Sequence, residues 1–185
     1  YIDQALGFQI IQGADPKTYE PVKDHINWAR DKDHYFYSND MIRADRKTFS
    51  FVNDYFLKDK DSVYVSPNIG AFRAVAANVG KVEAINKYYM RIDNTIYYPP
   101  FRQGSDVVTM PFNTIQTIRV LDQDHINVNN KSILFRGNKF KYELVDASSF
   151  ELFPTDEKYD SYGSNSYSKD KSYVYYNQEI IPGAD

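Results

Sequence analysis

Short runs of apolar and aromatic residues alternate with short polar turns along most of the chain. One such run, Tyr55–Leu57, leads into the polar stretch Asp59-Lys60-Asp61, and aromatic and β-branched residues follow it at Val63–Val65. A polar turn between two short apolar runs is typical of a β-hairpin, because Asp and Asn tolerate the backbone conformations of tight turns. The pattern therefore predicts a mainly β protein built from hairpins.

The hairpin pattern recurs along the chain and forms the first of two repeated motifs. Its clearest copies start with an Asp-Lys pair at residues 31, 59 and 170, and copies without this pair lie at residues 92–98 and 129–135. Tyrosines recur at fixed places after these turns, namely at Tyr35, Tyr37, Tyr64, Tyr97, Tyr98, Tyr175 and Tyr176. Such recurrence favours a shared core or strand face over a ligand site for these rings.

The second motif has the sequence Gly-Ala-Asp-Pro-Lys-Thr-Tyr at residues 13–19 and recurs with substitutions at residues 43–49. Looser copies lie at residues 104–110 and 145–150. Asp15 is a good helix N-cap, and Pro16 follows at the first helical position, where its missing N–H costs nothing. We therefore expect one helical turn in each copy, followed by an aromatic residue that packs into the core.

The alternation of the two motifs predicts a single domain over residues 1–185, made of about five units. Each unit is expected to hold a helical cap turn and a hairpin or three short strands, and the units to stack as an elongated β-repeat or β-meander. The expected units are 1–42, 43–69, 70–101, 102–140 and 141–185. Residues 71–86 are the exception, because they are rich in Ala and place Phe72, Val75 and Val79 at helical spacing, which predicts one short helix.

Composition supports this architecture and excludes several classes of protein. The 185 residues include 17 Tyr, 12 Phe and no Cys, with a formal net charge of −3. Aromatic residues favour strands, and the lack of Cys excludes disulfides and cysteine-based zinc sites. No apolar stretch approaches the roughly 20 residues of a membrane-spanning helix, and the acidic balance argues against nucleic acid as a partner. A signal peptide or lipid anchor upstream of Tyr1 stays open.

The Asp-Lys-x-x-aromatic-Tyr-Tyr pattern, alternating with Gly-Ala-Asp-Pro-Lys-Thr-aromatic-Glu, resembles the bacterial DKNYY family of repeat proteins. The match is close at residues 11–66 and 166–185 and weak from about 71 to 145. The Asn that follows Asp-Lys in the family is replaced here by Asp33, Asp61 and Ser172. The resemblance implies a repeat fold, a bacterial origin and a periplasmic or envelope location, with the cytoplasm as the alternative. The family has no known activity, so the resemblance implies no catalytic residue.

The histidines and acidic residues are the first candidates for chemistry. His25 and His125 share the tetrapeptide Asp-His-Ile-Asn, which fits either an acid–base pair or two equivalent strand starts. Acidic residues at 31, 33, 59 and 61 have the look of calcium-loop fragments. However, counting from Asp31, the sixth position is Phe36 and the twelfth is Ile42, where an EF-hand needs Gly and Glu. We therefore expect these acids to form hairpin turns, and we expect neither a metal nor a cofactor.

Nucleophile and phosphate-binding motifs are also absent from the sequence, which favours a binding role over an enzymatic one. Repeat scaffolds place recognition on loops of irregular length, here residues 71–86, 99–112 and 153–165. The last loop holds an acidic and aromatic group that suits a basic protein partner, namely Asp156, Glu157, Tyr159, Asp160 and Tyr162.

The sequence thus predicts a non-enzymatic protein-binding module of an exported or envelope protein. One form of such a module is an immunity protein, whose partner would be a basic bacterial toxin. The other expected partner is an envelope component. Binding of carbohydrate or cell wall through exposed aromatic residues is the first alternative. A hydrolase that uses Asp or Glu pairs with His25 or His125 is the second.

Overall fold

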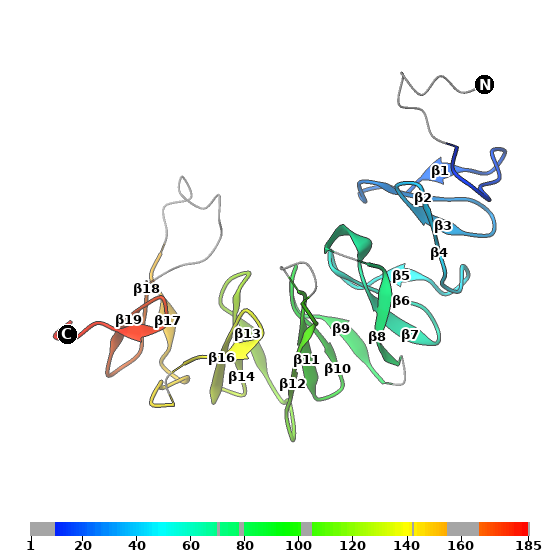
Figure 1. The fold of residues 1–185 in the computed structure, drawn as a ribbon. Coiled ribbons are helices and arrows are strands. Elements are labelled where there is room, and N and C mark those ends of the chain that lie inside the picture. The colour runs from blue at the N-terminus through cyan, green and yellow to red at the C-terminus, as the bar shows by residue number, and fades with distance from the viewer. Residues whose placement is uncertain are drawn as a thin grey trace, which may run out of the picture. The chain divides into compact units, whose positions relative to one another are not determined.

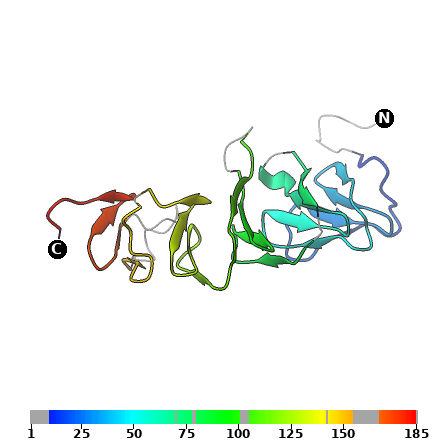
Figure 2. The same ribbon diagram turned by 90° about the horizontal axis from the view of Figure 1, so that it is seen from below.

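The computed structural model describes residues 10–69, 71–77, 80–100, 105–141, 143–154 and 167–184. In this part of the chain the strands form five four-stranded antiparallel sheets, and each sheet is a meander in which consecutive strands pair (Figure 1). Because each sheet is built from one continuous stretch of sequence, its colour is nearly uniform in Figure 2. The prediction of a mainly β repeat protein is confirmed.

The sheets are numbered 1 to 5 in chain order. Sheet 1 consists of β1 (Glu20–Pro21), β2 (Trp28–Arg30), β3 (Tyr35–Tyr37) and β4 (Asp40–Ile42). Sheet 2 consists of β5 (Ser50–Phe51), β6 (Phe56–Lys58), β7 (Ser62–Val65) and β8 (Arg73–Ala77), with the 3₁₀ helix η2 (Pro67–Ile69) before β8. Sheet 3 consists of β9 (Val82–Ala84), β10 (Met90–Ile92), β11 (Thr95–Tyr98) and β12 (Val108–Pro111). Sheet 4 consists of β13 (Ile118–Val120), β14 (His125–Val128), β15 (Ser132–Phe135) and β16 (Asn138–Lys139). Sheet 5 consists of β17 (Glu151–Leu152), β18 (Tyr167–Lys169), β19 (Val174–Tyr176) and β20 (Glu179–Ile180).

The chain divides into two compact units. The first unit comprises the described residues of Tyr1–Phe51 and Leu57–Val79, and the second comprises Val52–Phe56 and those of Gly80–Asp185. Sheet 1 and most of sheet 2 therefore belong to the first unit, and sheets 3, 4 and 5 belong to the second.

The hydrophobic core of each unit lies between successive sheets. In the first unit, Trp28 and Tyr35 of sheet 1 pack with Phe49 and Leu57 at sheet 2. In the second unit, one cluster joins sheets 3 and 4 and another joins sheets 4 and 5. The residues of the first cluster are Tyr89, Ile96, Tyr98, Ile126, Val128 and Leu134, and those of the second are Ile133, Phe140, Ala147, Phe150 and Tyr175. A single four-stranded meander is too small to bury its own apolar side chains, so each sheet depends on the next sheet in the chain.

Each sheet has four strands where the sequence predicts about three. The additional strands are very short, such as β5 and β20, and sequence alternation over two residues carries no usable signal. Strands β8 and β12 complete sheets 2 and 3. The sheets therefore do not divide at residues 70 and 102, where the sequence places the borders of units.

The predicted helix at residues 71–86 is wrong. The segment forms β8 and β9 instead, and residues 78 and 79 lie outside the described part. Gly80 limits any helix to about two turns, which is too short to be stable alone. Pairing of β8 with β7 supplies backbone hydrogen bonds instead, and its register shifts between Val63 and Tyr64.

The cap turns form where the motif is well preserved. The N–H of Thr18 donates to the carbonyl of Asp15, and the same bond joins Thr48 to Asp45 and Ser149 to Asp146. Of the aromatic residues that follow, Phe49 and Phe150 are buried as predicted, whereas Tyr19 is only half-buried and packs against Phe36. The looser copy at residues 104–110 is not a cap turn, because Val108–Pro111 forms β12 and pairs with β11.

Candidate functional site

The acid of each Asp-Lys pair holds a hairpin turn and a cap turn together. Asp59 Oδ1 accepts hydrogen bonds from the N–H groups of Asp61 and Ser62, both at 2.9 Å. Its Oδ2 accepts one from the N–H of Asp45 at 2.9 Å and one from the Tyr64 hydroxyl at 2.8 Å. A single buried carboxylate thus binds the turn, the cap and a strand.

The same arrangement recurs in the first and fifth sheets. Asp31 accepts from the N–H groups of Asp33 and His34 and from that of Asp15. Asp170 accepts from the N–H groups of Ser172, Tyr173 and Asp146, and from the Tyr175 hydroxyl at 2.8 Å. The interpretation of these acids as turn residues is confirmed.

The central copies keep this role although they lack the Asp-Lys pair. Asp93 Oδ1 accepts from the N–H of Lys81, and Asn129 Oδ1 accepts from the N–H groups of Gln116 and Thr117. In all five sheets, therefore, a turn side chain accepts a hydrogen bond from the segment that leads into the sheet's first strand. We call this arrangement the turn clamp.

The lysine of the signature contributes mainly through its backbone. The N–H groups of Lys32, Lys60 and Lys171 donate to the hydroxyls of Thr18, Thr48 and Ser149, respectively, in the preceding cap turns. The ammonium group of Lys171 also lies 2.7 Å from a carboxylate oxygen of Asp146, although both side chains meet water. The Asp-Lys pair is therefore a structural signature of the repeat.

The pKa values of the clamp acids agree with this role. Burial alone would raise the pKa of Asp31, Asp59 and Asp170, but the donated hydrogen bonds outweigh it and lower each pKa below its usual value. These carboxylates are ionised at neutral pH, and both of their oxygens accept hydrogen bonds. A general acid needs a raised pKa and access to a substrate, which this arrangement does not provide.

The two candidate histidines are packed against aromatic rings. His25, in the first unit, stacks on Phe51 with ring centroids 3.6 Å apart. His125, in the second unit, is 3% exposed, stacks on Phe135 and has Nδ1 3.0 Å from both carboxylate oxygens of Asp122. These contacts give each ring a structural role within its own unit. Within the described ranges, no group of three or more His, Asp or Glu side chains is placed to hold a metal ion.

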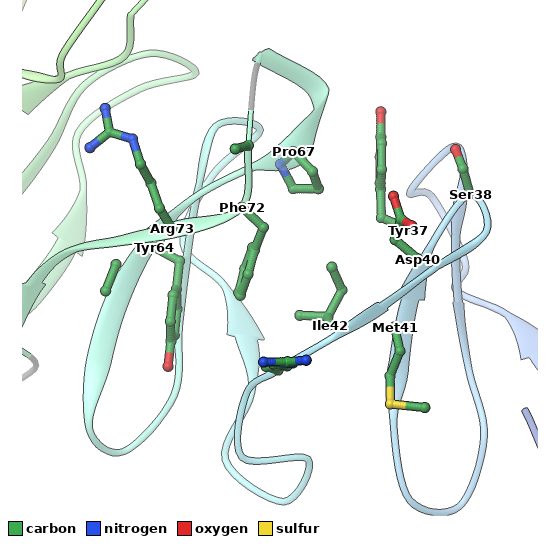
Figure 3. Close-up of a pocket in the computed structure, with 12 residues that line it drawn as sticks. Tyr37, Ser38, Asp40, Met41, Ile42, Tyr64, Pro67, Phe72 and Arg73 are labelled. Carbon is green, nitrogen blue, oxygen red and sulfur yellow. The ribbon is translucent and has the colours of Figure 1, made fainter. Parts of the chain in front are cut away.

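A groove with a volume of about 590 Å³ lies in the first unit, between the β3–β4 hairpin and the segment that connects β7 to β8 (Figure 3). One wall carries Tyr37, Asp40 and Met41, and the other carries Tyr64 and Phe72 (Figure 3). The complete lining is Tyr37, Ser38, Asp40, Met41, Ile42, Arg43, Tyr64, Pro67, Ala71, Phe72, Arg73 and Ala74. The volume is within the range of small-ligand sites.

Apolar contacts and a turn clamp hold the groove in shape. Tyr64 and Phe72 stack with centroids 4.6 Å apart and an interplanar angle of 17°. The Tyr64 hydroxyl donates to Asp59, so the clamp of sheet 2 fixes the far end of this ring. Ile42 is 4% exposed, whereas Arg43 and Arg73 are exposed cations in the lining. The groove therefore combines an apolar floor with charged edges.

The groove lies beside the long connection between β7 and β8. This connection spans residues 66–72 and includes η2, whereas β15 and β16 are joined by Arg136 and Gly137 alone. That short turn lies tightly against sheet 3, where a Cβ on Gly137 would be 2.6 Å from Tyr98 Cβ. The sequence signals the irregular segment from residue 71 onward, but it does not show that Tyr64 and Arg43 join it.

The proposed partner-binding residues Asp156, Glu157, Tyr159, Asp160 and Tyr162 lie outside the described residues. Phe153 and Tyr167, on either side of that segment, are 37% and 49% exposed. None of the helices in the described ranges is long and apolar enough to cross a membrane. Comparison of the chain with protein-family models, with curated proteins and with solved structures found no match.

Proposed function

We propose that the protein is a non-enzymatic protein-binding module and that the groove of the first unit receives an extended peptide segment of its partner. The observation that carries this proposal is the amphipathic lining, in which Tyr64 and Phe72 offer an apolar surface and Arg43 offers positive charge. Such a surface suits a segment with an apolar side chain and a nearby carboxylate.

The position of β8 supports an extended partner. Among the described strands, β8 ends sheet 2, and it lines the groove with Arg73 and Ala74. A terminal strand has one row of backbone groups directed away from its sheet, and a peptide strand can add to that row. The small side chains of Ala74 and Ala76 would let a peptide backbone approach closely.

The roles of the acids and histidines favour binding over catalysis. Asp31, Asp59 and Asp170 accept hydrogen bonds within turns, and His125 stacks on Phe135 while it contacts Asp122. A hydrolase would need such groups to be available to a substrate. The envelope location is proposed from the family resemblance, and the immunity role from the combination of a rigid repeat scaffold with charged, irregular loops.

The test begins with selection of peptides from a phage-displayed random library against the purified chain. We expect selected sequences that combine an apolar or aromatic residue with Asp or Glu. In isothermal titration with one synthetic peptide, Arg43→Glu should weaken binding at least tenfold, or about 1.4 kcal/mol. The charge reversal removes an attraction and adds a repulsion, while Arg43 is exposed and contributes little to folding.

Lys23→Glu is the matched control, because Lys23 is an exposed cation of the same unit that does not line the groove. It should leave the affinity unchanged. Equal affinity of the wild-type protein and the Arg43→Glu variant would refute the groove as the site. Retention on a glycan array or on insoluble cell wall, with no selected peptide, would favour the carbohydrate alternative.

A further inference from the structure

A second groove, with a volume of about 520 Å³, lies in the second unit at the edge of sheet 4. Its walls are the start of β15, the end of the last strand β16, and the segment that connects β16 to the cap turn of sheet 5. The lining includes Lys131, Lys139 and Lys141, together with Ser132 and the acid Glu143. We call this site the lysine groove.

The lysine groove lies where the repeat carries an insertion. Between sheets 1 and 2, only Arg43 and Ala44 separate β4 from the cap acid Asp45. Between sheets 4 and 5, residues 140–145 separate β16 from the cap acid Asp146. The longer segment forms one wall of the groove, so the site belongs to this part of the chain and not to the repeat as a whole.

Hydrogen bonds and core packing hold the walls of the lysine groove in shape. The Phe140 N–H donates to the carbonyl of Ile133 at 2.8 Å, which continues the pairing of β15 with β16. The side chains of both residues belong to the core between sheets 4 and 5. Lys141 donates through its N–H to the Gln178 side chain and through its ammonium group to Glu179. The connecting segment is therefore tied to sheet 5, and a site that is already ordered loses little entropy on binding.

Two of the lysines carry positive charge that the protein does not neutralise. Lys131 and Lys139 are exposed, and neither forms an ion pair with a residue in the described ranges. Ser132 is half-buried, and its hydroxyl makes no hydrogen bond to a described residue. Even with the exposed Glu143, the groove has an excess of positive charge, although the whole chain has a net charge of −3. Such a local excess attracts anions.

The types of donor favour a phosphate group over a carboxylate. Arg binds a planar carboxylate with two parallel hydrogen bonds, and Arg43 is a cation of the groove in the first unit. The cations of the lysine groove are all lysines, whose ammonium groups act as point charges and suit a tetrahedral phosphate. A phosphate monoester carries about 1.5 to 2 negative charges at neutral pH, which matches two ammonium groups.

We propose that the lysine groove binds the phosphate group of a soluble phosphate monoester through Lys131, Lys139 and Ser132. The two ammonium groups and the hydroxyl would each donate to a phosphate oxygen. Ile133 and Phe140 are only 2% and 6% exposed, so the groove offers little apolar surface to a lipid chain. The body of the ligand is therefore polar, as in a sugar phosphate.

Titration of the ¹⁵N-labelled whole chain with glucose 6-phosphate, followed by amide NMR shifts, tests the proposal. We expect saturable shifts at residues 131–133 and 139–141, with a Kd of about 1 mM or below. Lys131→Gln and Lys139→Gln should each weaken binding roughly fivefold or more, because each removes a charged donor. Their thermal midpoints should match that of the wild type, since both side chains are exposed and without an ion pair to a described residue.

Lys87→Gln is the matched control, because Lys87 is an exposed lysine of the same unit that does not line the groove. This variant should bind glucose 6-phosphate like the wild type, and acetate should give the wild type no saturable shift. The proposal would be overturned by the absence of saturable shifts with glucose 6-phosphate, by unchanged affinity in both folded groove variants, or by equally tight binding of acetate. Binding to vesicles that contain phosphatidic acid, without binding of glucose 6-phosphate, would also overturn it. None of these results bears on the groove of the first unit, whose test is peptide binding.

Discussion

Asp170 illustrates how much one residue does in this fold. Its two oxygens accept three backbone N–H groups and the Tyr175 hydroxyl, so it joins the cap turn, the hairpin turn and strand β19. An unmet donor in such a place costs more than a typical hydrogen bond contributes, because the group has already lost its water. The recurrence of the signature therefore has a physical cause in the unit's own stability.

Asp170→Asn should lower the free energy of unfolding by about 1–3 kcal/mol. The amide would keep one acceptor for the turn, but its NH₂ group would face the N–H of Asp146, which loses its acceptor. Urea unfolding followed by tyrosine fluorescence measures the difference. Asp33→Asn, at an exposed turn position, should shift the midpoint very little, and an equal loss in both variants would contradict the clamp.

Stability should also depend on pH in the acid range. Although burial opposes it, hydrogen bonding lowers the pKa of Asp31, Asp59 and Asp170, so each carboxylate binds protons less readily when folded than when unfolded. The stabilisation is then fully present above the unfolded value of about 4 and is lost as the pH falls through the folded values. Urea midpoints measured from pH 7 to pH 2 should be level at first and then fall below about pH 4.

The Asp170→Asn variant provides the control for this pH dependence. It lacks one of the titrating groups, so its urea midpoint should fall less steeply with acid than that of the wild type. A wild-type midpoint that is unchanged down to pH 2, or an identical slope in the variant, would show that the clamp acids titrate alike in both states.

At the scale of the element, a second ladder of polar side chains links the turns between first and second strands. The Asn53 side chain donates to the carbonyl of Asn86, and the Asn86 side chain donates to the carbonyls of Asp122 and Gln123. Both Asn side chains also accept N–H groups of their own turns. The matching stretches at residues 52–56 and 85–89 were a signal for these turns that the two-motif interpretation overlooked.

Asn86→Ala should destabilise the second unit by about 2 kcal/mol or more, since two donated and two accepted hydrogen bonds disappear. Asn86→Asp separates the bonds that Asn86 accepts within its own turn from those that it donates to the next turn. The carboxylate would retain both turn bonds but would repel the carbonyls of Asp122 and Gln123. Thermal unfolding of both variants measures the effect, and a midpoint for Asn86→Asp equal to the wild type would rule out a role for the ladder.

In the second unit, the short β15–β16 turn fills the space that is equivalent to the groove of the first unit. Two glycines distinguish the cost of backbone strain from the cost of a steric clash at such a turn. Gly137 has φ of +79°, and an added Cβ would lie 2.6 Å from Tyr98 Cβ and 3.0 Å from Val108 Cβ. Gly183 has φ of +74° with nothing within 4 Å. Gly183→Ala should therefore cost about 1 kcal/mol through the backbone alone, and Gly137→Ala about 2 kcal/mol more through the clash.

Differential scanning calorimetry compares the two glycine variants directly. The thermal midpoint of Gly137→Ala should fall clearly below that of Gly183→Ala. Equal midpoints would mean that the turn is not packed against sheet 3 as described.

Sequence reasoning works for elements whose residues recur, and it fails where context decides. The turn acids and the buried Phe49 and Phe150 are predictable because the same chemistry returns in several units. The helix at residues 71–86 is a wrong prediction because Ala suits both states, and pairing with β7 is invisible in a local pattern. The groove could not be predicted in full, since its walls come from hairpins more than 20 residues apart.

At the scale of the whole molecule, we propose separate roles for the repeated structure and for the surfaces that differ from sheet to sheet. The repeat signature supplies five clamped sheets in all. Within each of the two units, a hydrophobic core lies between successive sheets. The candidate binding surface arises where the repeat is irregular, at the long β7–β8 connection. This separation is the central claim, because it assigns the signature acids to folding and the groove to binding.

The most direct test is isothermal titration of one selected peptide into the Arg43→Glu and Asp170→Asn variants, with urea midpoints measured on the same samples. The account predicts that Arg43→Glu loses at least tenfold in affinity at an unchanged midpoint. It predicts that Asp170→Asn, while folded, keeps its affinity but has a lower midpoint. The opposite outcome, with lost affinity in folded Asp170→Asn and normal affinity in Arg43→Glu, would contradict it.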